Sequence, residues 1–226
     1  MKIRKYTAVV ALASRQAVAA RVVILGRAAF YAVLLVIFAR IWKIVGDKGA
    51  LGSFGRVDLV WYLALTELIA LSIPPVHLEI EADIRSGNIV YLLTRPISYF
   101  WMCFAQGLGT LLVRMAVLCP FGFSVALALG RELPRGGFSA LLAGALAAVG
   151  AATLSLLFYA IIGLSAFFIE DTSPVQWVWQ KLSFVFGGLM FPLDVYPRAM
   201  QRVASFTPFP SLLYAPGRIA IGAERA

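Results

Sequence analysis

The hydrophobic residues of this 226-residue chain are grouped into long stretches, and most charged residues lie between these stretches. No Asp, Glu, Lys or Arg occurs between Arg135 and Glu170, and Arg114 is the only charged residue from Pro96 to Gly130. A helix that crosses a membrane needs about 20 consecutive apolar residues. The pattern therefore predicts five transmembrane helices, at residues 22–44, 57–73, 107–129, 138–168 and 175–191.

The segment before the first predicted span is basic. Residues 1–21 contain five Lys or Arg and no acid, and we expect them to form an interfacial helix. Ala17-Val18-Ala19 is similar to a signal-peptide cleavage site, but Arg15 and Gln16 interrupt the approach to it, so the interfacial helix is the favoured interpretation. Basic segments stay preferentially on the cytoplasmic side, so the pattern predicts a cytoplasmic amino terminus.

The remaining segments are polar or rich in glycine and proline. Residues 46–55 are expected to be a glycine-rich loop, and residues 77–96 a loop on the cytoplasmic side by the span count. Gly187 and Gly188 weaken the last span and Pro192 ends it, so we expect residues 192–218 to be an outer-side re-entrant or interfacial region. The last ten residues are too few to cross a membrane, and we expect a sixth span beyond Ala226.

Composition supports a membrane protein and excludes other classes. The chain is 61% hydrophobic and 14% charged, whereas about 25% of the residues of a soluble domain are charged. The net charge of +9 does not indicate nucleic-acid binding, because the basic residues form no stripe with interleaved aromatics. His77, Cys103 and Cys119 are too few and too widely separated for a metal site or a disulfide.

Several charged residues fall within the predicted spans, and three of them, Arg27, Glu67 and Arg114, are considered as possible intramembrane polar contacts. Such residues are costly in lipid, so they either serve function or satisfy one another inside the protein. We favour internal contacts for all three and retain a functional role as the alternative for Glu67, as substrate- or proton-binding carboxylate, and for Arg114. Small residues at four-residue spacing, Gly144, Ala148 and Ala152, predict close helix packing, with a dimer contact as the second interpretation.

The loop at residues 77–96 has the most distinctive pattern of the chain. Ile80, Ile84 and Leu92 recur near helical spacing, Gly87-Asn88 interrupts them, and Pro96 disfavours helix at the residue before it. The pattern predicts a short helix, a break, and an arm that leads into the next span. An ordinary solvated loop and a partner-binding element are both compatible with this pattern.

Motifs across most of the chain resemble the type-2 permeases of ABC exporters. The loop reads Glu-x-x-Ile-Arg-Ser-Gly-x-Ile-x-Tyr-x-Leu-x-Arg-Pro from Glu81 to Pro96. Trp179-Gln180-Lys181-Leu182-Ser183-Phe184, followed by Gly187-Gly188 and Pro192, is similar to the family's fifth span. Trp61-Tyr62-Leu63 and Thr66-Glu67 also fit. The family has a sixth span, which the chain as given lacks.

The resemblance implies an all-α polytopic permease, without catalytic residues, in the bacterial plasma (inner) membrane. It would pair with a second permease, the same or a related chain, and with cytoplasmic ATPase subunits that bind ATP and Mg. No Gly-x-x-x-x-Gly-Lys-Ser/Thr motif occurs here, and we expect this chain to bind no cofactor or metal. A membrane-embedded enzyme and a channel or scaffold are the alternatives. The resemblance places these residues in the ATPase-coupling loop: Glu79, Glu81, Asp83, Ile84, Arg85, Gly87, Asn88, Tyr91 and Arg95.

Overall fold

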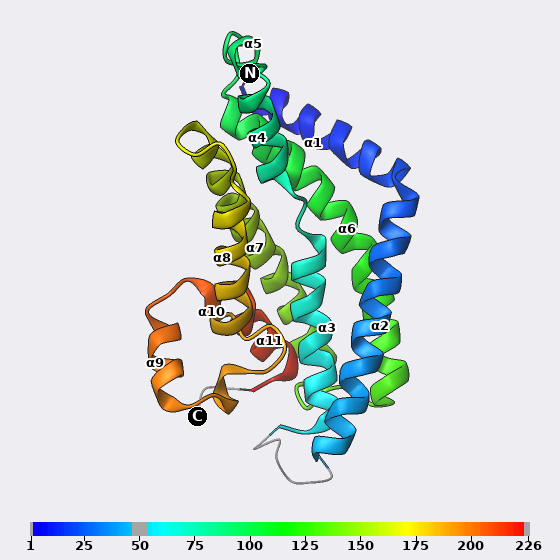
Figure 1. The fold of residues 1–226 in the computed structure, drawn as a ribbon. Coiled ribbons are helices and arrows are strands. Elements are labelled where there is room, and N and C mark those ends of the chain that lie inside the picture. The colour runs from blue at the N-terminus through cyan, green and yellow to red at the C-terminus, as the bar shows by residue number, and fades with distance from the viewer. Residues whose placement is uncertain (1, 47–53, 224–226) are drawn as a thin grey trace.

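The computed structural model describes residues 2–46 and 54–223, and within them the chain is helical, without a strand (Figure 1). Most of the predicted loop at 46–55 and the last three residues lie outside this part of the chain. The helices are α1 (Lys2–Ala19), α2 (Arg21–Gly46), α3 (Arg56–Ser72), α4 (Val76–Arg85), α5 (Ile89–Leu93), α6 (Tyr99–Gly130), α7 (Gly137–Leu164), α8 (Ser173–Phe186), α9 (Arg198–Ser205), α10 (Phe209–Leu212) and α11 (Tyr214–Ile221). The predicted all-α polytopic fold is confirmed.

Within the described residues, four helical segments are long and apolar enough to cross a membrane: Arg21–Val45, Arg56–Arg85, Tyr99–Gly130 and Gly137–Phe167. The sequence predicted five. The segment predicted as the fifth span, residues 175–191, forms α8, which has only 14 residues. At 1.5 Å per residue, α8 is about 21 Å long, less than the ~30 Å hydrocarbon core. It ends early because the chain turns at Gly188, which has a φ of +65°.

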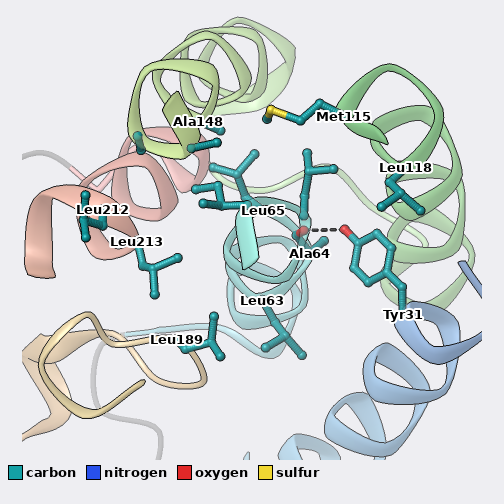
Figure 2. Close-up of a cluster of buried hydrophobic side chains, with 14 of the residues drawn as sticks. Tyr31, Leu63, Ala64, Leu65, Met115, Leu118, Ala148, Leu189, Leu212 and Leu213 are labelled. Carbon is teal, nitrogen blue, oxygen red and sulfur yellow. Dashed lines mark hydrogen bonds between the residues drawn. The ribbon is translucent and has the colours of Figure 1, made fainter. Parts of the chain in front are cut away.

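The central helix of the bundle is α3. The side chains of Leu63 and Leu65, which point in different directions from α3, are both fully buried. Figure 2 shows the α3 residues surrounded by Tyr31 from α2, Leu118 from α6 and Ala148 from α7, with Leu212 and Leu213 from the α10 region nearby. In contrast, α2 and α7 expose many apolar side chains, among them Leu25 and Leu146. The helices around α3 therefore offer their outer faces to lipid.

Buried hydrogen bonds join the carboxyl-terminal region to α3. The Thr66 hydroxyl donates to the Leu189 carbonyl oxygen at 2.7 Å, and the Tyr62 hydroxyl donates to the Gly188 carbonyl oxygen. On the other side, the Tyr31 hydroxyl donates to the Ala64 carbonyl oxygen (Figure 2). These bonds satisfy polar groups that would be costly to bury alone.

The arginines within the spans contact the backbone at the end of α3. Arg27 Nη1 donates to the Leu71 carbonyl oxygen at 2.6 Å, and Arg114 Nη1 donates to the Ile73 carbonyl oxygen at 3.2 Å. Helix ends leave carbonyl groups without intrahelical donors, and Pro74-Pro75 supplies no N–H here. Glu67 is 4% exposed, and no hydrogen bond or ion pair to it is found among the described residues. The arginines make the expected internal contacts, but not to Glu67.

The small-residue face of α7 packs inside the molecule. A Cβ added at Gly144 would lie 2.5 Å from the Ala220 Cβ of α11, and Ala148 and Ala152 are fully buried. Of the two interpretations, internal packing is the one that the structure shows for these three residues.

Candidate functional site at the α4–α5 cap

Residues 76–98 form one end of the molecule, which we call the α4–α5 cap. The cap contains α4, a turn at residues 86–88, α5, and the connection to α6. Figure 1 places it at the end of the bundle opposite α9 and the α10–α11 pair. The loop between α7 and α8 reaches the same end of the molecule.

Glycines on the neighbouring helices allow α4 to approach closely. A Cβ added at Gly107 of α6 would lie 2.7 Å from a methyl group of Val76, and one at Gly163 of α7 would lie 2.9 Å from the Ile80 Cβ. Ile80 is fully buried. The beginning of the cap is therefore wedged between α6 and α7, where Val76 and Ile80 occupy the space that a side chain would need at Gly107 or Gly163.

The acidic residues of α4 bind groups of this chain. The Glu81 carboxylate accepts hydrogen bonds from the Thr172 N–H at 3.1 Å and from the Thr172 hydroxyl, and it pairs with Arg85 at 3.1 Å. Asp83 accepts a 2.9 Å hydrogen bond from the Tyr99 hydroxyl, and Glu79 lies 3.5 Å from the Gln106 amide nitrogen. These carboxylates hold α4 to the start of α8 and to α6.

The turn after α4 depends on Gly87. Its φ is +75°, a left-handed conformation that side chains rarely adopt, and its N–H donates to the Ile84 carbonyl oxygen at 3.1 Å. The chain then enters α5 directly. The sequence predicted an arm at this position, and the arm begins with this short helix. Ile89 and Leu92, three residues apart, both pack inward, which is helical spacing.

The outer surface of the cap is apolar at α5. Val90, Tyr91 and Leu93 are 64%, 75% and 61% exposed, and the exposed residues Arg85, Asn88 and Arg95 lie beside them in the sequence. Ile84, which the resemblance places in the coupling loop, is partly buried and packs against the core of this chain. Val90 and Leu93 were not predicted as exposed contact residues. On a helical interpretation, each follows an inward-facing residue, Ile89 or Leu92, and would have been expected to face outward.

The loop before α8 adds an acid to this surface. Asp171 is exposed, and it accepts a 2.9 Å hydrogen bond from the Ser173 N–H. Hydrogen bonds from Ser173 lower the pKa of the Asp171 carboxyl below its ordinary value, and the charge of Arg85 lowers it further. The cap surface therefore carries charges of both signs around the apolar residues of α5.

The opposite end contains the predicted break and outer region. Pro192 is followed by the short turn Leu193–Val195, and Asp194 pairs with Arg218 at 3.4 Å. Burial raises the pKa of Tyr214, which donates to Asp194, to about 12. Residues 192–218 form short helices, and a cavity of about 970 Å³ lies between the start of α7 and residues 205–223.

A bundle of long apolar helices around a buried central helix defines a polytopic membrane protein. Its sequence matches the ABC-2 family transporter proteins over residues 28–225, so the chain belongs to this family. No match was found among the curated proteins or the solved structures. Family membership confirms the resemblance and supports the role of a transport permease rather than that of a catalytic enzyme.

Proposed function

We propose that this chain is the transmembrane permease subunit of an ATP-driven exporter in the bacterial plasma membrane. It would form the substrate pathway with a second permease, and cytoplasmic ATPase subunits that bind ATP and Mg would dock on the α4–α5 cap. The observation that carries the proposal is the exposure of Val90, Tyr91 and Leu93 on a cap that the rest of the chain holds in place.

Apolar side chains on a polar, well-anchored loop are typical of a protein interface. Aromatic residues at the centre of such surfaces often contribute most of the binding free energy. Tyr91 has this position, between Val90 and Leu93, and the neighbouring Arg85 and Asp171 can fix the orientation of a partner. A partner that moves the membrane helices also needs a firmly packed contact. The close packing of α4 against Gly107 of α6 and Gly163 of α7 supplies one.

A second permease is supported by α8. No residue of this helix is fully buried, and Gln180 and Lys181 are exposed near its middle. A lysine at the centre of a bilayer costs roughly 2.5–3.5 kcal/mol on translocon scales. Lys181 lies over the rings of Trp177 and Phe184, at 5.4 and 6.0 Å from their centroids. A second permease against this face would remove these polar groups from lipid.

The charge distribution supports a cytoplasmic cap. The basic α1 begins at the same end as the cap, because the Ser98 N–H of the cap donates to the Tyr6 hydroxyl of α1 at 3.3 Å. Segments rich in Lys and Arg favour the cytoplasmic side, so the amino terminus and the cap are both assigned to that side.

Co-purification tests the proposal. The tagged permease from its native host should bring down a soluble ABC ATPase, and Tyr91→Ala with Leu93→Ser should weaken this association by at least ~30-fold, the equivalent of ~2 kcal/mol. Phe206→Ala is the matched control, because Phe206 is 91% exposed and follows α9, outside the cap. Retention of the ATPase by the double variant would refute the assignment of the cap.

A further inference from the structure

A groove lies between α1 and the beginning of α6, outside the α4–α5 interface with the ATPase proposed above. It consists of two adjoining cavities, about 440 and 510 Å³, which share Tyr6 and Trp101. The first cavity is lined almost entirely by carbon, with Val10 from α1 and Phe104 and Leu108 from α6. These volumes lie within the range of small-molecule sites, ~300–1,000 Å³.

Two contacts between α1 and α6 bound the groove along its length. At the inner end, Gly109 allows the helices to meet, because a Cβ added there would lie 2.4 Å from the Val10 carbonyl oxygen. At the outer end, the Ser98 N–H donates to the Tyr6 hydroxyl. The groove therefore follows the packed pair formed by α1 and the beginning of α6.

Trp101 forms the exposed wall of the groove. Its ring is nearly perpendicular to that of Phe104, with centroids 5.7 Å apart, and it also contacts Phe100 edge-on at 5.3 Å. Trp101 nevertheless remains 51% exposed. Tryptophan is enriched where lipid headgroups meet the hydrocarbon core, because its ring is apolar and its N–H is polar. The groove is therefore suited to a molecule with both parts.

The charges beside the groove are positive. Arg4 and Lys5 precede Tyr6 on α1, Arg95 precedes Pro96 at the second cavity, and all three are exposed. No ion pair is found for these three residues within the described part of the chain. The nearest acids of the cap, Glu79 and Asp83, contact a different face of α6 through Gln106 and Tyr99.

From this geometry we infer that the groove binds an anionic phospholipid of the membrane leaflet. An acyl chain lies in the first cavity against Phe104 and Leu108, and the phosphate headgroup lies at the second, near Arg4, Lys5 and Arg95. The basic mouth favours an anionic over a zwitterionic lipid, because each Lys or Arg near such a headgroup adds electrostatic attraction. The site would fix α1 against α6 and does not depend on the transport function.

Fluorescence quenching by brominated lipids tests this inference on the full chain in phosphatidylcholine nanodiscs. The Trp101 signal is the difference between the wild type and Trp101→Phe. A small fraction of brominated phosphatidylglycerol should quench this signal more strongly than the same fraction of brominated phosphatidylcholine. Arg95→Gln should reduce the preference by about fivefold, and Lys5→Gln should add to that loss. Thr7→Phe, which fills the first cavity, should reduce quenching by both lipids.

The matched control is Arg131→Gln with Arg56→Gln, which removes two exposed cations at the other end of the bundle and should leave the preference unchanged. As a second measurement, phosphatidylglycerol should raise the melting temperature of the detergent-solubilised wild type, and raise that of the Lys5→Gln, Arg95→Gln variant less. Equal quenching by both brominated lipids, or an unchanged preference in the charge variants, would mean that the groove contacts lipids without selecting anionic ones. Either result would overturn the inference.

Discussion

Glu81 and Thr172 lie 91 residues apart in the sequence, and both are buried in one hydrogen-bonded pair. The Glu81 carboxylate accepts from the N–H of Thr172 at 3.1 Å and from its hydroxyl. This pair connects α4 to the residue that precedes α8. The cap and the loop between α7 and α8 are therefore held as one unit at this end of the molecule.

Thr172→Val should destabilise that unit. Valine keeps the shape and the backbone N–H but loses the hydroxyl donor to a charged acceptor, at a cost of about 1.5–3 kcal/mol in the free energy of unfolding. Chemical denaturation in detergent measures this change. Thr153→Val is the control, because the Thr153 hydroxyl is exposed and bonds only to the Val149 carbonyl oxygen of its own helix. Equal losses in both variants would contradict the role given to the Glu81 pair.

Ile84→Ala and Tyr91→Ala should have separable effects. Ile84 packs against the core of this chain, so its truncation should lower the free energy of unfolding by about 1–3 kcal/mol. Tyr91 is exposed, so its truncation should leave unfolding nearly unchanged and weaken ATPase recruitment. Denaturation and co-purification of the two variants, measured side by side, provide the comparison. The reverse pattern would place the partner contact on α4 instead of α5.

The packing of α7 against α11 can be tested with two glycines of the same helix. Gly144→Ala would bring a methyl group to 2.5 Å from the Ala220 Cβ and should cost about 1–3 kcal/mol by overpacking. Gly150→Ala meets nothing within 4 Å and should be neutral or stabilising by up to about 1 kcal/mol. Melting temperatures of the two variants give the answer. A neutral Gly144→Ala would mean that α11 does not pack here.

Topology is checked by cysteine labelling after Cys103 and Cys119 have been replaced by serine. A cysteine at Asn88 should react with a membrane-impermeant thiol reagent only after the cells are opened, because the cap is assigned to the cytoplasm. A cysteine at Phe206, which is 91% exposed directly after α9, should react in intact cells, because residues 192–218 are assigned to the outer side. Labelling of Asn88→Cys from outside would reverse the orientation.

The pattern of apolar residues was enough to predict the long helices. The second span was predicted at 57–73 and α3 is Arg56–Ser72, because Pro74-Pro75 marks its end in the sequence itself. The small-residue spacing likewise predicted that α7 has a closely packed face, which Gly144 confirms. Both features depend on local signals of a few residues.

Other features depend on contacts that no local pattern contains. Nothing near Glu81 in the sequence indicates that Thr172 will donate to it, since the pairing arises only when α4 and α8 pack beside α7. The short length of α8 was missed because the apolar stretch continues past Gly187 and Gly188 although the helix does not. The five residues of α5 are too few to separate helical from alternating periodicity.

The wedge of α4 between Gly107 and Gly163 has a mechanical consequence. Side chains can absorb small displacements by changing rotamers, but Gly107 and Gly163 have no side chain of their own that could move aside for α4. Close-packed interiors have low compressibility. A displacement of α4 is therefore expected to move α6 and α7 with it, whereas Pro74-Pro75 interrupts the helical connection to α3. The close contact of α4 with α6 and α7 thus depends on the absence of a side chain at Gly107 and Gly163.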